Sequence, residues 1–535
     1  MTSRPTRIVI LGGGFGGVYT ALTLEKLLGK AANVEINLIS KENYIVFQPM
    51  LPEVLSGSIG LVDTLTPIRR LCPRTNLYTR PIEGIDLKRQ RITAAQGFGS
   101  HPCELEYDHL VIALGNVTSF AGVPGLTEHA LPFKYLSDAL TIRNHVIHAL
   151  EQADIEADPA VRQALLTFVV AGGGFSGVEA AAELNDFVRA AAKSYRNTMA
   201  RDLRVVLLHA GAVILPEMPE NLGVFAGKLL AQRGVDIRYQ TRLAGATAGY
   251  ALLATGERIA TKTLVSTVPS APNPLVAVLP CAKDKGRIVV DADLQLPDYP
   301  GVWAVGDCAF ILDAKTGEPA PPTAQHAVRE ARCVASNIVA TMHGAPPKVF
   351  SYKALGKMGS LGHRSAVAEV CGLRLSGFLA WWLWRTVYLL KLPGLDRKLR
   401  VALDWTLDLF LPPDIVQLKA DRALGLGREH FEADETIFRE GDRGDRLYVV
   451  IDGEVEVVND SSDGGERVLR TLGAGEAFGE IALINESPRT ATVRCKSRTN
   501  VLSIDRDAFN ALFTTLPELR QFFQQLVAQR LTPPR

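Results

Sequence analysis

Two glycine-rich turns constrain the fold of this chain more than any other feature. The turns GGGFGG and GGGFSG each follow a short apolar stretch (residues 8–11 and LLTFVVA) and precede a helix-forming segment. Their glycines share one spacing: Gly12, Gly14 and Gly17 in the first turn, Gly172, Gly174 and Gly177 in the second. Each unit predicts a strand, a G-x-G-x-x-G turn and a helix, which bind a pyrophosphate through backbone N–H groups and the helix dipole. Two such units 160 positions apart predict two dinucleotide-binding domains.

In each unit, the residue after the second strand is expected to contact the ribose of the dinucleotide. Glu42 offers a carboxylate slightly late after the strand expected at residues 34–39, and His209 follows the strand expected at 204–208. An NADH site normally has Glu at this second position. A neutral His can bond a ribose hydroxyl, whereas a protonated His tolerates a 2′-phosphate. NADH is favoured, and NADPH stays open.

Length, charge and cysteine usage exclude several classes of protein. A chain of 535 residues predicts three or four domains. The 58 basic and 57 acidic residues give a net charge of +1, which does not favour a nucleic-acid-binding protein. The seven scattered cysteines form no C-x-x-C pair, which argues against a metal site and a dithiol centre. An apolar strand within the first residues leaves no room for a signal peptide, so a cytosolic location or the cytoplasmic side of the inner membrane is expected.

Two further apolar stretches indicate where a flavin would bind. EYDHLVIALGN (residues 106–116) and GVWAVGDCA (301–309) both predict buried strands, and the second ends at Gly306 and Asp307. With the two glycine turns, these stretches resemble the flavoprotein reductases that bind FAD in a first domain and NAD(P)H in an inserted second domain. The resemblance implies that Asp307 bonds the ribityl or phosphate part of FAD.

The subclass follows from what the chain carries and lacks. No cysteine pair follows the first turn and none surrounds the second, so neither a disulfide reductase nor a sulfide:quinone oxidoreductase is expected. From about residue 5 to residue 420 the chain resembles the type II NADH dehydrogenases, single-chain NADH:quinone oxidoreductases. The resemblance is carried by FQPML (47–51), FKYLSDALTIRNHV (133–146), GGGFSGVEAAAEL (172–184), VWAVGDCA, PPTAQHAV (321–328) and SGFLAWWLWR (376–385).

This resemblance implies a set of site residues. It implies FAD contacts at Gly12, Gly14, Phe15, Gly16, Gly17, Glu42, Gln48, Pro49, Ala113, Gly115, Gly306, Asp307, Ala324 and Gln325. It implies NADH contacts at Gly172, Gly174, Phe175, Ser176, Gly177, Glu179 and His209. Glu179 is the candidate active-site acid, with a helix first-turn Glu as the alternative. Gln325 begins the quinone-site motif A-Q-x-A-x-Q, but Arg329 stands where its second Gln belongs, where its charge could favour an anionic reduced quinone.

The implied reaction needs little side-chain chemistry. In the family NADH gives a hydride to FAD and a membrane quinone then takes two electrons, so no metal or nucleophile is required. Because Arg329 breaks the quinone motif, a second class stays open. In that alternative the chain is a flavin-based NAD(P)H redox sensor, or a reductase with another acceptor, and its C-terminal fold is an interaction module.

An aromatic and basic segment follows the second glycine unit. Trp381, Trp382, Trp384 and Trp405 fall within 25 residues, and LSGFLAWWLWRTVYLLKL is shorter than the ~20 apolar residues that span a bilayer. Leu399, Leu403, Thr406, Leu407 and Phe410 share one helical face, among Arg385, Lys391, Arg397, Lys398 and Arg400. The pattern predicts a peripheral membrane segment on the anionic inner face of the membrane, where the quinone is dissolved. A core or dimer-interface helix pair is the alternative, and a homodimer is expected.

After Gly427 the pattern changes to short alternating strands separated by glycines. Residues 427–535 resemble the cyclic-nucleotide-binding domain, and FGEIALINESPRTATV resembles its phosphate cassette. The resemblance implies that Glu480 bonds the ribose 2′-OH and Arg489 the cyclic phosphate of cAMP or cGMP. The implied contacts are Phe478, Gly479, Glu480, Ile481, Ala482, Arg489, Thr490 and Ala491. The alternative is a roll that has lost its ligand, and the helices expected at 507–513 and 516–531 leave no segment to read DNA.

The expected architecture is therefore α/β. It comprises two Rossmann-like domains, an amphipathic helical membrane-surface segment and an all-β double-stranded β-roll with flanking helices. The expected boundaries are 1–160 and 297–360 for FAD, 161–296 for NAD(P)H, 361–426 for the membrane and quinone segment, and 427–535 for the cyclic nucleotide. Because the roll directly follows the amphipathic segment, we hypothesise that nucleotide binding tilts residues 397–410 and alters quinone access.

Overall fold

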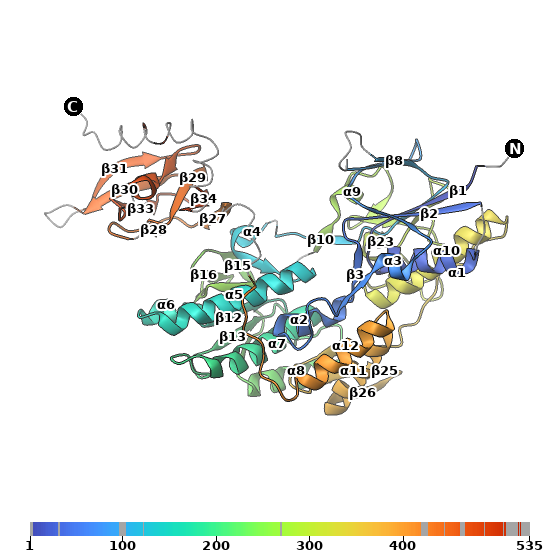
Figure 1. Ribbon diagram of the computed structural model, residues 1–535, viewed down its shortest axis with the longest axis horizontal. Coiled ribbons are helices and arrows are strands. Elements are labelled where there is room, and N and C mark those ends of the chain that lie inside the picture. The colour runs from blue at the N-terminus through green and yellow to red at the C-terminus, as the bar shows by residue number, and fades with distance from the viewer. Residues whose placement is uncertain are drawn as a thin grey trace.

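A parallel sheet with strand order β22-β9-β1-β2-β5 carries the first glycine turn at its carboxyl edge (Figure 1). Its strands are β1 (Thr6–Leu11), β2 (Val34–Ser40), β5 (Asn76–Thr79), β9 (His109–Ile112) and β22 (Val302–Ala304). β1 is central, so residues 8–11 are fully buried, and a strand covered on both faces carries a continuous apolar run. α1 (Phe15–Leu28) packs along α10 (Ala324–Met342), which returns to this first sheet from far along the chain.

The computed structural model describes residues 4–29, 33–95, 103–120, 122–267, 270–418, 426–442, 444–460, 466–485, 487–506, 508–509, 523 and 525. The helices expected at 507–513 and 516–531 lie almost wholly outside these residues.

A second parallel sheet has the order β11-β18-β12-β13-β14. Its strands are β11 (Ala130–Pro132), β12 (Thr167–Ala171), β13 (Arg204–Leu208), β14 (Val235–Arg238) and β18 (Thr263–Ser266). Along β12, Phe168 and Val170 face a core shared with α5 (Leu136–Ile155), α7 (Phe175–Ala191) and α8 (Glu220–Gln232). Val169 and Ala171 face the opposite core, shared with the antiparallel strands β15 (Leu243–Ala246), β16 (Tyr250–Leu253) and β17 (Arg258–Ala260). Strand alternation thus builds three layers.

The chain crosses between the two sheets at one paired site. β10 (Asn116–Thr118) leads out of the first sheet and pairs antiparallel with β19 (Ser270–Pro272), which leads back. Directly after β10, the outgoing chain forms α4 (Leu126–His129) and joins the second sheet as β11.

Residues 356–407 form an antiparallel sheet and a pair of helices. β24 (Gly356–Ser360), β25 (Ala366–Val370) and β26 (Leu373–Gly377) precede α11 (Phe378–Lys391) and α12 (Leu395–Leu407), which we call the helix pair. Trp384 and Trp405 are 1% and 6% exposed and pack in the core beneath the pair, so these two are not surface tryptophans as the sequence suggested. No helix in the described part of the chain combines the length and apolar character needed to cross a membrane.

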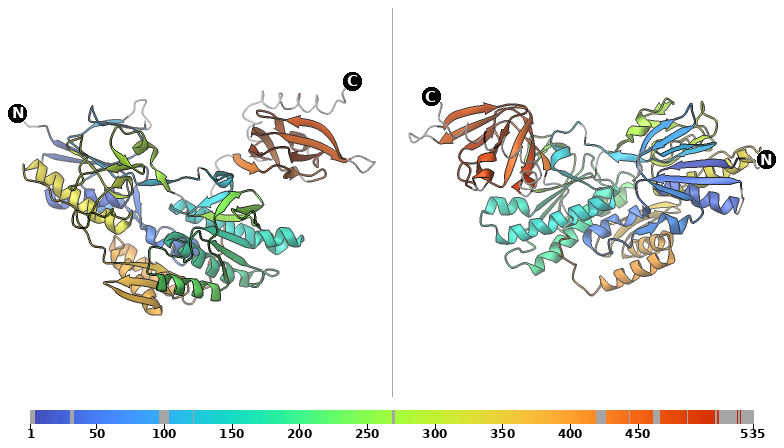
Figure 2. Two further views of the ribbon diagram at one scale, coloured as in Figure 1. Left: turned by 180° about the vertical axis from the view of Figure 1, so that it is seen from behind. Right: turned by 45° about the horizontal axis from the view of Figure 1, so that its top comes forward.

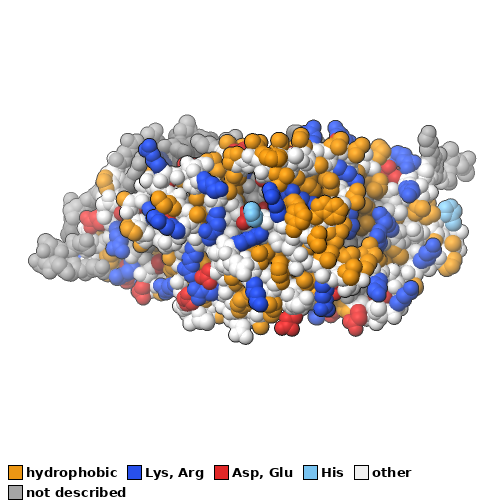
Figure 3. Space-filling model, turned by 90° about the horizontal axis from the view of Figure 1, so that it is seen from below, with side chains coloured by type: hydrophobic (Ala, Val, Ile, Leu, Met, Phe, Trp, Pro, Cys, Tyr) orange, Lys and Arg blue, Asp and Glu red, His pale blue; other side chains and the backbone are white. Residues whose placement is uncertain are grey.

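The outer face of the helix pair is apolar. Its exposed large side chains are Phe378, Leu379, Trp382, Leu390, Leu395, Leu399, Leu403, Leu407 and Phe410. Figure 3 shows the molecule from this side, where hydrophobic side chains gather beside Lys and Arg.

The C-terminal residues form two antiparallel sheets with the orders β27-β34-β29-β32 and β28-β33-β30-β31. The first contains β27 (Leu426–Phe431), β29 (Arg446–Asp452), β32 (Ala477–Phe478) and β34 (Thr499–Asp505). The second contains β28 (Thr436–Phe438), β30 (Val455–Asp460), β31 (Glu466–Leu472) and β33 (Thr492–Cys495). A shared apolar core lies between them, and α13 (Glu480–Ile484) follows β32.

These C-terminal sheets contact the second sheet and lie apart from the helix pair (Figures 1 and 2). β27 packs against α4, where the His129 imidazole meets the His430 backbone. The connecting segment is fixed along α5, because the Asn144 side chain bonds both the N–H and the carbonyl of Leu418 (3.0 and 2.8 Å). The hypothesised direct push from these sheets on residues 397–410 is therefore not supported, because the described sheets and the helix pair lie apart in all views (Figures 1 and 2).

Candidate active site and cyclic-nucleotide pocket

In the first glycine turn, Gly12 and Gly17 pack tightly against backbone atoms, whereas Gly14 and the nearby Gly115 face open space. Gly12 has φ +110°, and a Cβ there would lie 2.3 Å from the Ala113 carbonyl oxygen. A Cβ on Gly17 would lie 1.8 Å from the Gly12 oxygen. In contrast, a Cβ on Gly14 or Gly115 would meet no described atom within 4 Å. The turn can thus place bare backbone against a pyrophosphate at the start of α1, so these residues fit a dinucleotide.

Asp307 lies at the same edge, in the short helix η3 (Gly306–Cys308) after β22. Burial raises the pKa of the Asp307 carboxyl, and the charges of Lys134 and Arg287 oppose this rise. Glu330 on α10 accepts a 2.7 Å bond from the Gly306 N–H, and burial raises its pKa to about 7. Lys134 and Glu330 are functional candidates that no sequence motif indicated.

The other residues predicted to contact FAD surround this edge. They are Phe15 and Gly16 on α1, Glu42 exposed after β2, Gln48 and Pro49 in η1 (Gln48–Met50), Ala113 after β9, and Ala324 and Gln325 at the start of α10. Phe15 and Phe47 meet edge to face at 6.1 Å, which joins the glycine turn to the η1 segment.

The second turn repeats the first, with one difference at His209. Gly172 has φ +121°, and a Cβ on Gly177 would lie 1.8 Å from the Gly172 oxygen. Phe175 and Ser176 begin α7. The His209 imidazole packs beneath Gly173, with its Nε2 2.8 Å from the Val213 carbonyl oxygen. This nitrogen already has a protein partner, which the sequence could not indicate.

Glu179 projects from α7 toward β24. Its Oε1 accepts a 2.9 Å bond from the Ser360 N–H at the end of β24. Burial raises the pKa of Glu179 to about 8, and this bond opposes the rise. A carboxyl that keeps its proton at neutral pH can act as a proton donor.

Near Glu179, α10 and α11 bring together aromatic and basic side chains. The Tyr388 ring lies 5.9 Å from Phe47, and its hydroxyl pKa is raised by burial and by Glu179. The Arg329 guanidinium lies 5.2 Å from the Tyr352 ring. Burial lowers the pKa of Lys391, and the charge of Arg329 lowers it further. Gln325 makes two long bonds: its Nε2 donates to the Gly356 oxygen at 3.4 Å, and its Oε1 accepts from the Tyr352 hydroxyl at 3.5 Å.

In the C-terminal sheets, Arg489 and Glu480 are both buried, at 4% and 1% exposure. Arg489 donates to the Gly479 and Arg446 carbonyl oxygens (2.8 and 2.9 Å) and lies 4.0 Å from the Phe438 ring. Gly479 has φ +80° and begins α13. Ile481 is half-buried, Phe478, Ala482 and Ala491 are buried, and Thr490 is exposed. A buried guanidinium beside an aromatic ring suits a phosphate and a base, and Phe438 had no motif to indicate it.

Comparison with known proteins shows the family. The model of the pyridine nucleotide-disulphide oxidoreductases matches residues 6–331, the NDH2 C-terminal domain 355–411 and the cyclic nucleotide-binding domain 428–515. A type II NADH:quinone oxidoreductase of Mycobacterium tuberculosis is 32% identical over 419 residues, covering 75% of this chain and 88% of that protein. This chain belongs to the type II NADH:quinone oxidoreductases.

Further relatives support this assignment. The demethylphylloquinone reductase of Synechocystis is 32% identical over 413 residues, covering 76% of this chain and 96% of that protein. The structure of Plasmodium falciparum NDH2 in complex with NADH covers 77% of this chain and 100% of its own, with a TM-score of 0.71 at 19% identity, and shares the fold.

The predicted enzyme class is confirmed, and the sensor alternative is not needed. The family match implies that this enzyme uses a flavin and NADH, and the chain also contains a cyclic nucleotide-binding domain. The described cysteines are all free, and no group of His, Cys, Asp and Glu in the described residues has the arrangement of a metal site.

Proposed function

We propose that FAD lies along the first glycine turn and Asp307, that NADH lies along the second turn, and that the two meet beside Glu179. The observation that supports this proposal is the tight packing of both turns. In each turn the last glycine lies so close to the first that a Cβ would clash with the backbone. When bound, FAD would accept a hydride and pass on electrons. The chain's own part is to bind, to orient the rings, and to hold a proton on Glu179 near neutral pH. We propose NADH over NADPH, because the Mycobacterium tuberculosis relative is named an NADH:quinone oxidoreductase.

We propose that the quinone approaches from the helix pair and meets Gln325 and Arg329. The supporting observation is that Arg329 and Lys391 lie close enough for the charge of one to lower the pKa of the other. Two cations at this place favour a partner that gains negative charge as it is reduced.

A test compares Arg329→Gln with wild type in NADH oxidation with a soluble quinone. We expect the quinone KM to rise about tenfold while anaerobic reduction of the flavin by NADH stays unchanged. An unchanged quinone KM would place the quinone elsewhere.

We infer that the enzyme binds the anionic inner face of the membrane from the cytoplasmic side, as a peripheral homodimer. The exposed apolar face of the helix pair, with basic side chains beside it, supports the membrane contact. The dimer follows from the expectation for the family and is tested by sedimentation in detergent and on anionic vesicles.

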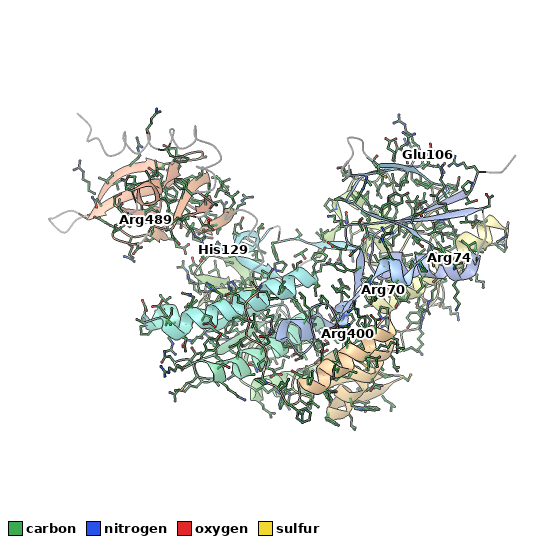
Figure 4. All side chains as sticks on the ribbon, in the orientation of Figure 1. Arg70, Arg74, Glu106, His129, Arg400 and Arg489 are labelled. Atoms are coloured by element: carbon green, nitrogen blue, oxygen red, sulfur yellow. The ribbon has the colours of Figure 1, made fainter. Side chains whose placement is uncertain are left out.

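We infer further that cAMP or cGMP binds at Glu480 and Arg489 and regulates the enzyme through the second sheet. A cyclic phosphate would compete with the Gly479 and Arg446 carbonyl oxygens for the Arg489 guanidinium. Arg446 also pairs with Glu429 at 2.9 Å, and Glu429 precedes His430, whose backbone meets His129 on α4. Figure 4 labels Arg489, His129 and Arg400, and Arg400 on α12 lies far from the first two. We therefore assign the regulated step to NADH and not to quinone access.

Calorimetry with cAMP and with cGMP tests the binding itself. Arg489→Ala should abolish it, and Lys496→Gln, which removes an exposed 2.9 Å ion pair with Glu454 in the same sheets, should not. A wild type that binds neither nucleotide would show that the fold has lost its ligand.

A further inference from the structure

A buried carboxylate joins the flavin-side segment to both helices of the pair. Glu53 is 3% exposed and lies on α2 (Leu51–Ser56), directly after η1. Its Oε1 accepts bonds from the Trp405 indole N–H on α12 (3.1 Å) and from an Arg385 N–H on α11 (3.4 Å). Its Oε2 is buried with no hydrogen-bond partner among the described residues. Glu53 thus sits where three helices meet, and the activity described above does not use it.

Arg385 is held on three sides. Its guanidinium lies 4.3 Å from the Trp381 ring and 4.5 Å from the Trp405 ring, and Glu53 contacts its edge. The Arg385 side chain is only 15% exposed. A planar guanidinium stacked between two indoles and paired with a carboxylate has one favourable orientation. Without Glu53 the buried cation would lose the carboxylate that bonds it, which is costly, and Glu183 and Asp408 would remain as the acidic groups whose pKa values its charge lowers.

Arg385 lies on the same side of α11 as Tyr388, which packs toward the flavin-side segment. Tyr388 lies three positions further along the same helix, and residues at this spacing share a face. The Tyr388 ring packs against Trp384 at 4.8 Å and against Phe47 at 5.9 Å. Phe47 directly precedes Gln48 in η1, so Glu53 and Phe47 come from the same short segment of chain.

We propose that Glu53 is a positioning residue for quinone reduction, because through Arg385 it sets the rotation of α11 and so the placement of Tyr388 against Phe47. The proposal rests on the quinone approaching from the helix pair, as proposed above. Glu53 acts through Arg385 and touches neither substrate.

The chain supplies a matched control in a second ion pair. Asp63 and Arg397 are 3.4 Å apart, and their side chains are 11% and 14% exposed. This pair also ties the chain after α2 to the helix pair, but it reaches the start of α12 and not the face that carries Tyr388. A merely structural role predicts similar effects from both pairs.

The experiment uses holoenzyme of Glu53→Ala, Glu53→Gln, Trp405→Phe and Asp63→Asn. Stopped-flow absorbance follows flavin reduction by NADH without quinone, and then reoxidation by a soluble quinone. We expect Glu53→Ala to slow reoxidation or raise the quinone KM about tenfold, with flavin reduction within about twofold of wild type. Glu53→Gln keeps the acceptor for both donors and should restore most of the loss. Asp63→Asn should lower the melting temperature while leaving quinone kinetics within about twofold.

Equal quinone defects in Glu53→Ala and Asp63→Asn would overturn the proposal, as would a Glu53→Ala enzyme with unchanged reoxidation. If Glu53→Ala does not fold, Trp405→Phe carries the test, because it removes the indole N–H that bonds Glu53 and leaves an aromatic ring at this position. An unchanged reoxidation in Trp405→Phe would then overturn it. Arg329→Gln tests separately whether the quinone binds beside Arg329. Its result therefore distinguishes a wrong quinone site from a wrong role for Glu53.

Discussion

The imidazole Nε2 of His129 lies 2.9 Å from the backbone nitrogen of His430 and 3.0 Å from its carbonyl oxygen. Burial lowers the pKa of His129, so at neutral pH its unprotonated nitrogen accepts the His430 N–H. The contact joins β27 of the C-terminal sheets to α4, which follows directly after the crossing strand β10. A change in the position of β27 would therefore reach the junction between the two dinucleotide-binding sheets.

Replacing His129 with Ala tests this junction. We expect cAMP or cGMP still to bind, but any effect of the nucleotide on the KM for NADH to fall below about twofold. Coupling between two sites is typically ~1–3 kcal/mol and reciprocal, so NADH should also lose its effect on nucleotide affinity. Calorimetry and initial rates measure both. A nucleotide effect that persists in His129→Ala, or that acts on the quinone KM instead, contradicts this route.

The pH dependence of quinone reduction should follow Glu179. Its pKa of about 8 means that the folded protein holds this proton below pH 8 and releases it above, whereas the unfolded chain releases it near 4.5. We expect reoxidation of the flavin by quinone to slow as the pH rises through 8. Glu179→Gln has no proton to give, so its rate should be about 100-fold lower and lose this pH dependence. The free energy of unfolding should also fall as the pH rises. The folded state binds the Glu179 proton more tightly than the unfolded chain, so its contribution to stability is lost between pH 4.5 and about 8. A variant with the wild-type pH profile would exclude Glu179 as the donor.

Asp307→Asn should weaken flavin binding. Removing a charge-assisted hydrogen bond costs about 2 kcal/mol, which corresponds to more than tenfold in affinity. The purified wild type should be yellow and release FAD on acid precipitation, whereas the variant should lose colour on dialysis. Glu318→Gln, which removes an exposed carboxylate eleven positions after Asp307, is the control. Equal FAD content in both variants would show that Asp307 does not hold the flavin.

Membrane binding should depend on the exposed face of the helix pair and not on its buried tryptophans. Leu399 and Leu403 are 65% and 58% exposed, and replacing both with Ser should reduce partitioning onto anionic vesicles about tenfold or more. Val278→Ser, at a 78% exposed position outside the helix pair, should not reduce partitioning. Trp384→Ser should instead lower stability by about 3–5 kcal/mol, because this side chain is 1% exposed. If the double variant partitions onto vesicles as wild type does, the exposed face of the helix pair would instead be a dimer interface.

Local patterns predicted the parts of the site that depend on backbone geometry. The glycine spacing, the apolar runs of β1 and β12 and the cassette around Arg489 each report a constraint within a few residues, and the structure brings them to the expected strand ends. The contacts of Lys134, Glu330 and Glu53 join segments up to 352 residues apart, and no periodicity encodes such a pair. Trp384 and Trp405 were also misplaced, because the sequence pattern of aromatic and basic residues is the same whether the indoles face lipid or a protein core. The docking of β27 on α4 depends on the path of the linker, which its sequence alone does not determine.

Because Asn144 bonds Leu418 and β27 begins at Leu426, only seven residues of sequence separate these two points of the chain. A short tether holds its two ends at a local concentration of roughly millimolar, so an interface too weak to join separate proteins can still close within one chain. C-terminal sheets that separated from α4 would thus stay close to it. A ligand of ordinary affinity shifts a contact between domains only when that contact is weak, because the shift is limited by the difference in the ligand's affinity for the two states.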